Sequence, residues 1–179
     1  MEMQACRSPA FVGFLAGQLR AAFGDDPAFA PDNLLRLYTR VERGFIRVDA
    51  DEVTYPLHVI LRHRLERALI LGDLEVADLP AAWNDGMREL VGVVPPDDRL
   101  GCLQDIHWPS GGFGYFPSYT LGALLAAQLF GAAQSRIPRL MDAIAAGDFA
   151  PLLEWLREHV HGRGCLPRFA EMVADATGG

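Results

Sequence analysis

The chain has 179 residues, half of them hydrophobic and 22% charged, a composition that excludes a disordered protein. The formal net charge is -7 and no cluster of Lys and Arg occurs, which argues against nucleic acid as a partner. No apolar run reaches the roughly 18 uncharged residues of a membrane span, and no signal peptide is recognisable. The spacing of the three cysteines (Cys6, Cys102, Cys165) does not match a disulfide pattern. We therefore expect a cytoplasmic protein without a membrane partner.

Apolar residues recur at helical spacing along most of the chain, and the predicted fold class is therefore mainly α with little or no strand. The first predicted helix carries the phenylalanines of residues 11–23 and ends at Gly24. Asp32 or Asn33 is expected to cap the second helix. Residues 45–49 alternate in polarity and predict a short extended segment.

A long helix is predicted over residues 51–71, with a buried stripe formed by Leu57, Ile60, Leu61, Leu65 and Leu69. On this helix, the basic run of residues 62–64 is interpreted as a solvated face. Asp78 is expected to cap the next helix, which extends to Leu90. After a glycine-rich loop, a helix from Tyr119 to about residue 146 is predicted to break near Pro138.

The last predicted helix carries Leu152 and Trp155 and is expected to be capped by Asp148. No internal repeat, low-complexity tract or linker divides the chain. We therefore predict a single helical domain over residues 1–179.

The segment from Gly101 to Tyr119 contains the candidate functional residues. It places an imidazole (His107), a carboxylate (Asp105), an amide (Gln104) and phenols around a glycine-rich turn. Packing alone does not require this mixture, and glycine allows the backbone to approach another group closely. The sequence thus predicts a site in this loop. A hydrogen-bonded core histidine and packed tyrosines remain the structural alternatives.

The histidines and cysteines do not form a recognisable metal or nucleophile site. None of the five histidines belongs to an HExxH motif, and His58 and His63 would point in roughly opposite directions on a helix. Residues 158–161 (EHVH) are better interpreted as cations near a helix C-terminus. There is no GxSxG motif and no phosphate-binding loop. We therefore expect no metal site and no cofactor in this chain.

Two motifs resemble signatures of the thermostable zinc carboxypeptidases, the carboxypeptidase Taq-like family: Gly101-x-x-Gln104-Asp105-x-His107-Trp108 and Ile46-Arg47-x-x-Ala50-Asp51. Residues 51–58, 72–80 and 113–122 are also similar to that family, and residues 1–8 resemble the stretch that directly follows its HESQ motif. The resemblance covers nearly the whole chain.

The resemblance implies a multi-helix fragment of a zincin-type metallocarboxypeptidase, an enzyme that is a homodimer and releases C-terminal residues from peptides with one zinc ion. The family's zinc ligands, from HExxH and HESQ, would all precede Met1, and the family's chain would continue past Gly179. We therefore expect a chain that is truncated at both ends and has no zinc ligand of its own.

The resemblance also implies roles for individual residues. Arg47 would bind the free carboxylate of the peptide C-terminus, for which a guanidinium is suited, with pairing to Asp49 or Asp51 as the structural alternative. His107 and Tyr119 would contact the oxyanion or the substrate backbone as the catalytic pair.

Three further residues receive supporting roles. Gln104 and Asp105 would orient His107 or neighbouring backbone, and Tyr115 would line the peptide groove. Trp108 is expected to belong to the core rather than to the groove.

Two functional hypotheses follow. In the first, the chain is the substrate-binding half of a metallocarboxypeptidase, inactive alone and completed in trans by an N-terminal zinc-binding half. The alternative is a non-enzymatic helical module for peptide binding or dimerisation. In both cases we expect a homodimer or larger species, because exposed apolar faces favour self-association.

Overall fold

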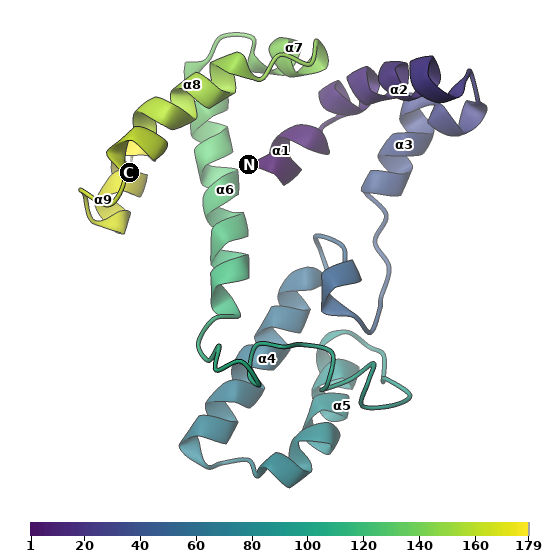
Figure 1. The fold of residues 1–179 in the computed structure, drawn as a ribbon, viewed down its shortest axis with the longest axis vertical. Coiled ribbons are helices and arrows are strands. Elements are labelled where there is room, and N and C mark those ends of the chain that lie inside the picture. The colour runs from purple at the N-terminus through teal and green to yellow at the C-terminus, as the bar shows by residue number, and fades with distance from the viewer. Residues whose placement is uncertain (179) are drawn as a thin grey trace. The chain divides into compact units, whose positions relative to one another are not determined.

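The computed structural model describes residues 1–178, and in this range the chain forms helices, turns and loops without a strand. The mainly α fold class predicted from the sequence is therefore confirmed. The chain divides into two compact units, one formed by residues 1–39 together with the chain from 123 onward, the other by residues 40–122 (Figure 1). The single domain over residues 1–179 stays a prediction.

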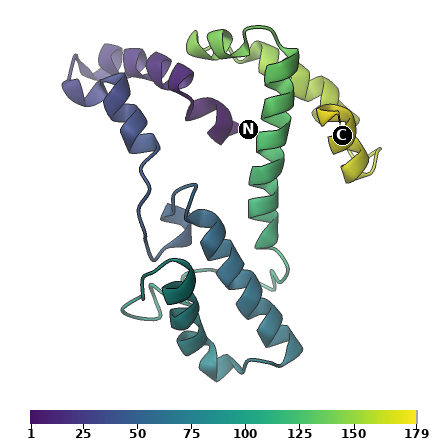
Figure 2. The same ribbon diagram turned by 180° about the vertical axis from the view of Figure 1, so that it is seen from behind.

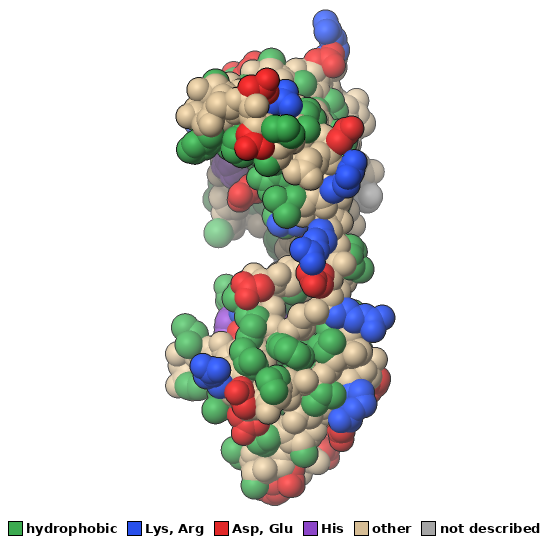
Figure 3. All heavy atoms as spheres, turned by 90° about the vertical axis from the view of Figure 1, so that its right-hand side faces the viewer, with side chains coloured by type: hydrophobic (Ala, Val, Ile, Leu, Met, Phe, Trp, Pro, Cys, Tyr) green, Lys and Arg blue, Asp and Glu red, His purple; other side chains and the backbone are tan. Residues whose placement is uncertain are grey.

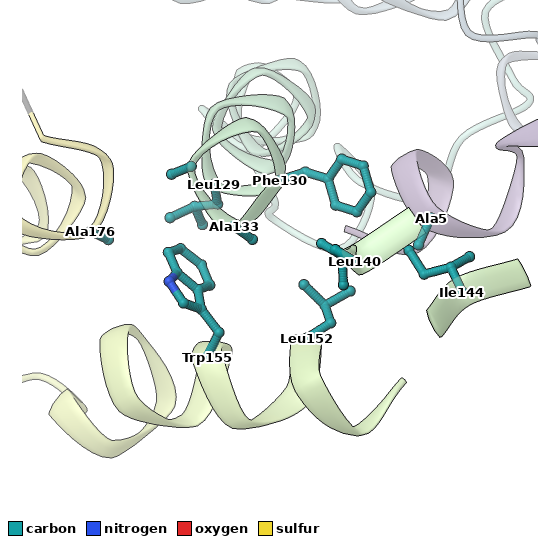
Figure 4. Packing of buried hydrophobic residues seen from close by; sticks show 10 residues of the cluster. Ala5, Leu129, Phe130, Ala133, Leu140, Ile144, Leu152, Trp155 and Ala176 are labelled. Atoms are coloured by element: carbon teal, nitrogen blue, oxygen red, sulfur yellow. The ribbon is translucent and has the colours of Figure 1, made fainter. Parts of the chain in front are cut away.

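The first unit contains short and medium helices: α1 (Glu2–Cys6), α2 (Pro9–Phe23), α3 (Pro31–Tyr38), most of α6 (Pro117–Arg136), α7 (Leu140–Ala145), α8 (Ala150–His159) and α9 (Phe169–Thr177). Its main core forms where α6, α7 and α8 meet, with Trp155 of α8 pointing toward Leu129 and Ala133 of α6 (Figure 4). A smaller cluster of Val12, Ala16 and Leu34 joins α2 to α3.

The second unit is built on two helices, α4 (Tyr55–Leu71) and α5 (Leu79–Leu90), which lie side by side (Figures 1 and 2). Their shared core contains Leu61, Leu65, Trp83 and Met87. A Cβ atom at position 86 would overlap the Leu61 side chain, so Gly86 allows the helices to approach closely. The long loop after α5 crosses this pair and leads into α6.

Several helix starts differ from the prediction. Helix α3 begins at Pro31 with Ala30 as its N-cap, so the predicted cap at Asp32 or Asn33 is wrong. The Asn33 amide instead donates to the Ala28 carbonyl at 2.9 Å. Proline in the first turn needs no partner for a backbone N–H and fixes φ for the helix, which explains the early start.

Two other predicted capping residues lie at the start of a helix but do not make the expected N-cap hydrogen bond. Asp78 is the N-cap of α5 but makes no side-chain cap hydrogen bond. Asp148 accepts from the Ala150 backbone N–H at 2.9 Å, one residue before the N-cap of α8. The predicted end of α2 at Gly24 is confirmed, with φ of 95°.

The segment before α4 is compact rather than extended. Residues Arg47–Asp49 form a single 3-10 turn, so the predicted extended segment is wrong over these residues. The Asp51 carboxylate accepts from the backbone N–H groups of Val53 and Thr54, both at 2.9 Å, and shapes the entry to the helix. Helix α4 consequently begins at Tyr55, four residues later than predicted.

The buried face of α4 is more polar than the apolar stripe predicted. Leu61 and Leu65 are buried as expected, but Ile60 is 38% exposed. Arg62 is fully buried, so the solvated face predicted for residues 62–64 is wrong at that position. Its two side-chain partners, Asp105 and Gln104, lie more than 40 residues away in the loop that follows α5.

The break predicted near Pro138 is confirmed, since α6 ends at Arg136 and α7 starts at Leu140. Among residues 1–178, no helix combines the length and hydropathy needed to cross a bilayer.

Candidate functional site

Asp105 joins two buried arginines within the 40–122 unit. Its Oδ1 accepts from Arg47 Nε at 3.1 Å and from Arg47 Nη2 at 2.7 Å, and its Oδ2 accepts from Arg62 Nε at 2.5 Å. Arg47 is 5% exposed and Arg62 is fully buried. One carboxylate therefore compensates two guanidinium groups, and this cluster carries one excess positive charge.

Gln104 connects the same two arginines to the backbone. Its Oε1 accepts from the Arg47 backbone N–H at 2.9 Å and from Arg62 Nη2 at 2.8 Å. Its Nε2 donates to the Phe45 carbonyl at 3.0 Å and to two carbonyls of its own loop. The amide is thus fully used in holding the segment around Arg47 against the loop.

The charges of the cluster are coupled. Burial alone would raise the pKa of Asp105, but the hydrogen bond from Arg47 and the charge of Arg62 lower it. Burial lowers the pKa of Arg62 to about 10, with Asp105 opposing this shift, so Arg62 remains charged at neutral pH. Burial likewise opposes charge on Arg47, yet its hydrogen bond to Asp105 raises the pKa of Arg47 overall.

Aromatic rings enclose the Arg47 guanidinium. Its carbon lies 5.1 Å from the ring centroid of Tyr119 and 5.6 Å from that of Phe116, within the range of cation–π attraction. Arg47 Nη1 also donates to Tyr55 Oη at 2.7 Å. A guanidinium has five N–H donors, so the three bonds to Asp105 and Tyr55 leave two N–H groups without a hydrogen-bond partner among the described residues.

The structure brings together His107 and Tyr119, the two residues expected to contact the oxyanion or the substrate backbone. His107 Nε2 lies 3.1 Å from Tyr119 Oη, at hydrogen-bond distance. The backbone of His107 is held by the Gly112 N–H, which donates to its carbonyl at 2.7 Å. A Cβ atom at position 112 would lie 3.0 Å from that carbonyl oxygen, so glycine is needed for this close turn.

Asp105 approaches His107 without bonding to it. The distance from His107 Nδ1 to Asp105 Oδ1 is 3.7 Å, too long for a hydrogen bond. Nδ1 is buried and makes no hydrogen bond in the described structure. The Asp105 carboxylate therefore binds the two arginines directly. The expectation that Gln104 and Asp105 orient His107 or neighbouring backbone stays a prediction.

Tyr115 lies at the outer side of this group. Its ring is edge-on to Tyr119 with centroids 5.3 Å apart, and the residue is 51% exposed. Burial and the neighbouring Tyr115 raise the pKa of Tyr119, although Arg47 opposes the shift. The Tyr119 hydroxyl is therefore protonated at neutral pH and can donate a hydrogen bond.

Sequence analysis missed four polar residues of the site, and three of them share one face of α4. His58, Arg62 and Glu66 are spaced four residues apart and all are buried, while Tyr55 begins the helix. Burial and the charge of Arg62 lower the pKa of His58 to about 4, so its imidazole is neutral at pH 7. A four-residue polar repeat beside the apolar stripe was the signal that could have revealed them.

No group of three or more His, Cys, Asp or Glu side chains that could hold a metal occurs in residues 1–178. In residues 158–161, His159 stacks on Trp155 with ring centroids 4.7 Å apart, and its Nδ1 is 3.9 Å from a Glu158 oxygen. These contacts fit a packed helix end better than a metal ligand set.

The chain resembles known carboxypeptidases over its whole length. A sequence profile of the carboxypeptidase Taq (M32) metallopeptidases matches residues 1–179. Thermostable carboxypeptidase 1 of Thermus thermophilus is 47% identical over 138 residues, covering 77% of this chain and 27% of the relative. Thermostable carboxypeptidase 1 of Pyrococcus furiosus is 38% identical over 172 residues, covering 96% of this chain and 34% of the relative.

Solved structures agree. Metallocarboxypeptidase 1 of Trypanosoma cruzi superposes with a TM-score of 0.94 at 43% identity, covering 99% of this chain and 37% of that one. The M32 carboxypeptidase of Deinococcus radiodurans gives a TM-score of 0.91 at 40% identity, covering 97% of this chain and 35% of that one. This chain thus spans about a third of the length of these relatives. Its sequence and its fold both place it in the carboxypeptidase Taq (M32) family of metallopeptidases.

Proposed function

We propose that this chain binds the C-terminal end of a peptide for a zinc metallocarboxypeptidase, with Arg47 binding the terminal carboxylate. The observation that carries the proposal is the fixed Arg47 guanidinium, which keeps two unused N–H groups close to the His107–Tyr119 pair. Family membership supports the same chemistry.

The charge of the site favours a carboxylate ligand. Arg47 and Arg62 share only Asp105, so an added carboxylate would neutralise the remaining positive charge. Charge-assisted bonds to guanidinium are among the stronger hydrogen bonds in proteins. Because Arg47 is 5% exposed, the carboxylate reaches it only after one of the surrounding phenol rings shifts.

His107 and Tyr119 are proposed as the groups that contact the reacting carbonyl. The tetrahedral intermediate of peptide hydrolysis places negative charge on an oxygen, and each donor aimed at such an oxyanion contributes roughly 3–4 kcal/mol. The protonated Tyr119 hydroxyl can supply one donor, and His107 holds that hydroxyl in place. The exposed Tyr115 ring would line the groove for the peptide. Gln104 and Asp105 would act by holding Arg47.

Hydrolysis in this family needs zinc, and residues 1–178 contain no group of three or more His, Cys, Asp or Glu side chains that could hold a metal. We propose that this chain alone is inactive and depends on zinc ligands from an N-terminal half of the enzyme.

We also propose a homodimer, supported by apolar side chains at the surface (Figure 3). Leu103 and Ile106 are among the exposed apolar residues. Metal analysis and light scattering of the purified chain test these two points. Family membership does not favour the non-enzymatic module.

Binding of a peptide carboxylate is the direct test. An N-acetylated dipeptide with a free C-terminus should bind the chain in a calorimetric or NMR titration, and its C-terminal amide should bind much more weakly. Arg47→Gln should weaken binding of the free acid roughly 10- to 100-fold, the value of one lost charged hydrogen-bond pair. Arg62 remains to compensate Asp105, so the variant keeps a counter-ion for that carboxylate.

The matched control is Arg64→Gln, because the Arg64 side chain is 56% exposed and forms a surface ion pair with Glu89. That variant should bind like the unaltered chain. Equal affinity for the acid and the amide, or no detectable binding of either, would contradict the proposal.

A further inference from the structure

Arg62 and Glu66 on α4 carry opposite charges one helical turn apart, and such neighbours ordinarily pair with each other. Here both are buried, at 0% and 4% exposure, and no ion pair joins them among the described contacts. Each side chain instead reaches a different part of the loop that follows α5. Burial of charged groups is costly unless they are fully hydrogen-bonded, so these two contacts need a specific explanation.

Arg62 holds the start of the loop motif. Its Nε donates to Asp105 Oδ2 at 2.5 Å, and its Nη2 donates to Gln104 Oε1 at 2.8 Å. Its Nη1 donates to the His58 carbonyl at 2.9 Å. The guanidinium carbon also lies 4.6 Å from the ring centroid of Trp83. With its three nitrogens bonded and an aromatic ring beside it, this side chain has one available orientation.

Glu66 holds the other end of the motif. Its Oε2 accepts from Trp108 Nε1 at 2.7 Å, and its Oε1 accepts from the Gly114 backbone N–H at 2.5 Å. Gly114 has φ of +75°, a conformation that glycine adopts without strain. One carboxylate thus ties together two points of the loop that are six residues apart and closes the turn that contains Gly112.

His107 lies between these anchors, directly before Trp108 and two residues after Asp105. The one hydrogen-bond contact recorded for its ring in the described chain is with Tyr119 at 3.1 Å. The ring also packs on Phe116, with ring centroids 4.5 Å apart, and the backbone that carries it is held by α4 on both sides. We propose that Arg62 and Glu66 form a two-point clamp that positions His107 against Tyr119. Its functional meaning rests on the proposed role of His107, but the clamp itself can be tested without substrate.

The test uses NMR on the 179-residue chain, comparing Arg62→Lys and Glu66→Gln with the unaltered protein. Lysine cannot reproduce the guanidinium fork, and glutamine presents an NH₂ group to one of the two donors. Both variants should lose the nuclear Overhauser contact between the His107 and Tyr119 rings. Glu66→Gln should also shift the Trp108 indole N–H resonance. If Arg62 and Glu66 only added stability, their variants would have a lower melting temperature, but these signals of the folded state would be unchanged.

Arg64→Lys and Glu89→Gln are matched controls, because these side chains form an exposed pair at 3.2 Å between α4 and α5. They should leave the His107 signals in place. If Glu66→Gln does not fold, Trp108→Phe removes the indole donor while keeping an aromatic ring, and it should shift the His107 ring signals.

Folded clamp variants with His107 and Trp108 signals at the positions of the unaltered chain would overturn the inference. A failure of the unaltered chain to bind the dipeptide would instead count against the proposed function and would leave these ring contacts unaffected. The two ideas can therefore fail separately.

Discussion

Replacing Asp105 by Asn should lower the free energy of unfolding by about 3–5 kcal/mol, the cost of leaving buried charges without a partner. The carboxylate now accepts three hydrogen bonds from Arg47 and Arg62. An Asn side chain has one oxygen to accept these bonds, and its NH₂ group would face a guanidinium donor. Two buried cations would also remain without an anion. Urea unfolding of the variant and the unaltered chain measures the difference.

The matched control is Asp85→Asn. Asp85 also accepts from an arginine, Arg88 Nη1 at 2.6 Å, but the side chains are 77% and 60% exposed. Exposed pairs typically contribute only about 0–1 kcal/mol. If Asp105→Asn lowered the free energy of unfolding no more than Asp85→Asn does, the buried cluster would not be held together by its shared carboxylate.

Acid should destabilise the chain through His58, by about 2–3 kcal/mol between pH 7.5 and pH 4.5. Burial and the charges of Arg62 and Arg47 lower the pKa of His58 from 6.5 to about 4, with Asp105 and Asp51 opposing. Between these two values the unfolded chain binds a proton that the folded chain does not. The contribution of His58 to the free energy of unfolding is therefore fully present above pH 6.5 and is lost as the pH falls toward 4.

His58→Leu should remove most of this dependence. Both ring nitrogens of His58 are buried without a hydrogen-bond partner in the described structure, so an apolar side chain of similar size sacrifices no bond. Urea unfolding at the two pH values measures the effect, and His63→Leu on the exposed side of α4 should behave like the unaltered chain. An equal pH dependence in His58→Leu would show that other groups cause the acid sensitivity.

Much of this architecture could be predicted from the sequence because it depends on local rules. Helical periodicity predicted the mainly α fold, and the proline after Ile137 predicted the break between α6 and α7. The glycine-rich loop predicted close backbone approach, and Gly112 makes it against His107. The resemblance of the loop motif led to the pairing of His107 with Tyr119.

The polar contents of the core could not be predicted in the same way. Arg62 and Glu66 have partners 42–48 residues away, and periodicity contains no information about such contacts. A basic run on a helix is ordinarily solvated, so Arg62 was assigned to the surface. The bond between Asp105 and Arg62 could not be predicted for the same reason, because Arg62 was expected to be exposed.

The position at which α3 begins could not be predicted from the sequence either. Asp32 and Asn33 are good capping residues, yet the preceding Pro31 starts α3 earlier. A proline and two capping residues at adjacent positions each indicate a helix start, and the sequence alone does not show which of them begins the helix.

Asp105 is an ionised, buried counter-ion shared by Arg47 and Arg62, and the geometry of the site depends on it. NMR titration of the Asp105 side-chain carboxyl carbon in the folded chain measures this ionisation. Because the two arginines outweigh the effect of burial, the pKa of Asp105 should lie below its ordinary value of 3.8. A midpoint at or above 3.8 in the folded chain would contradict the account.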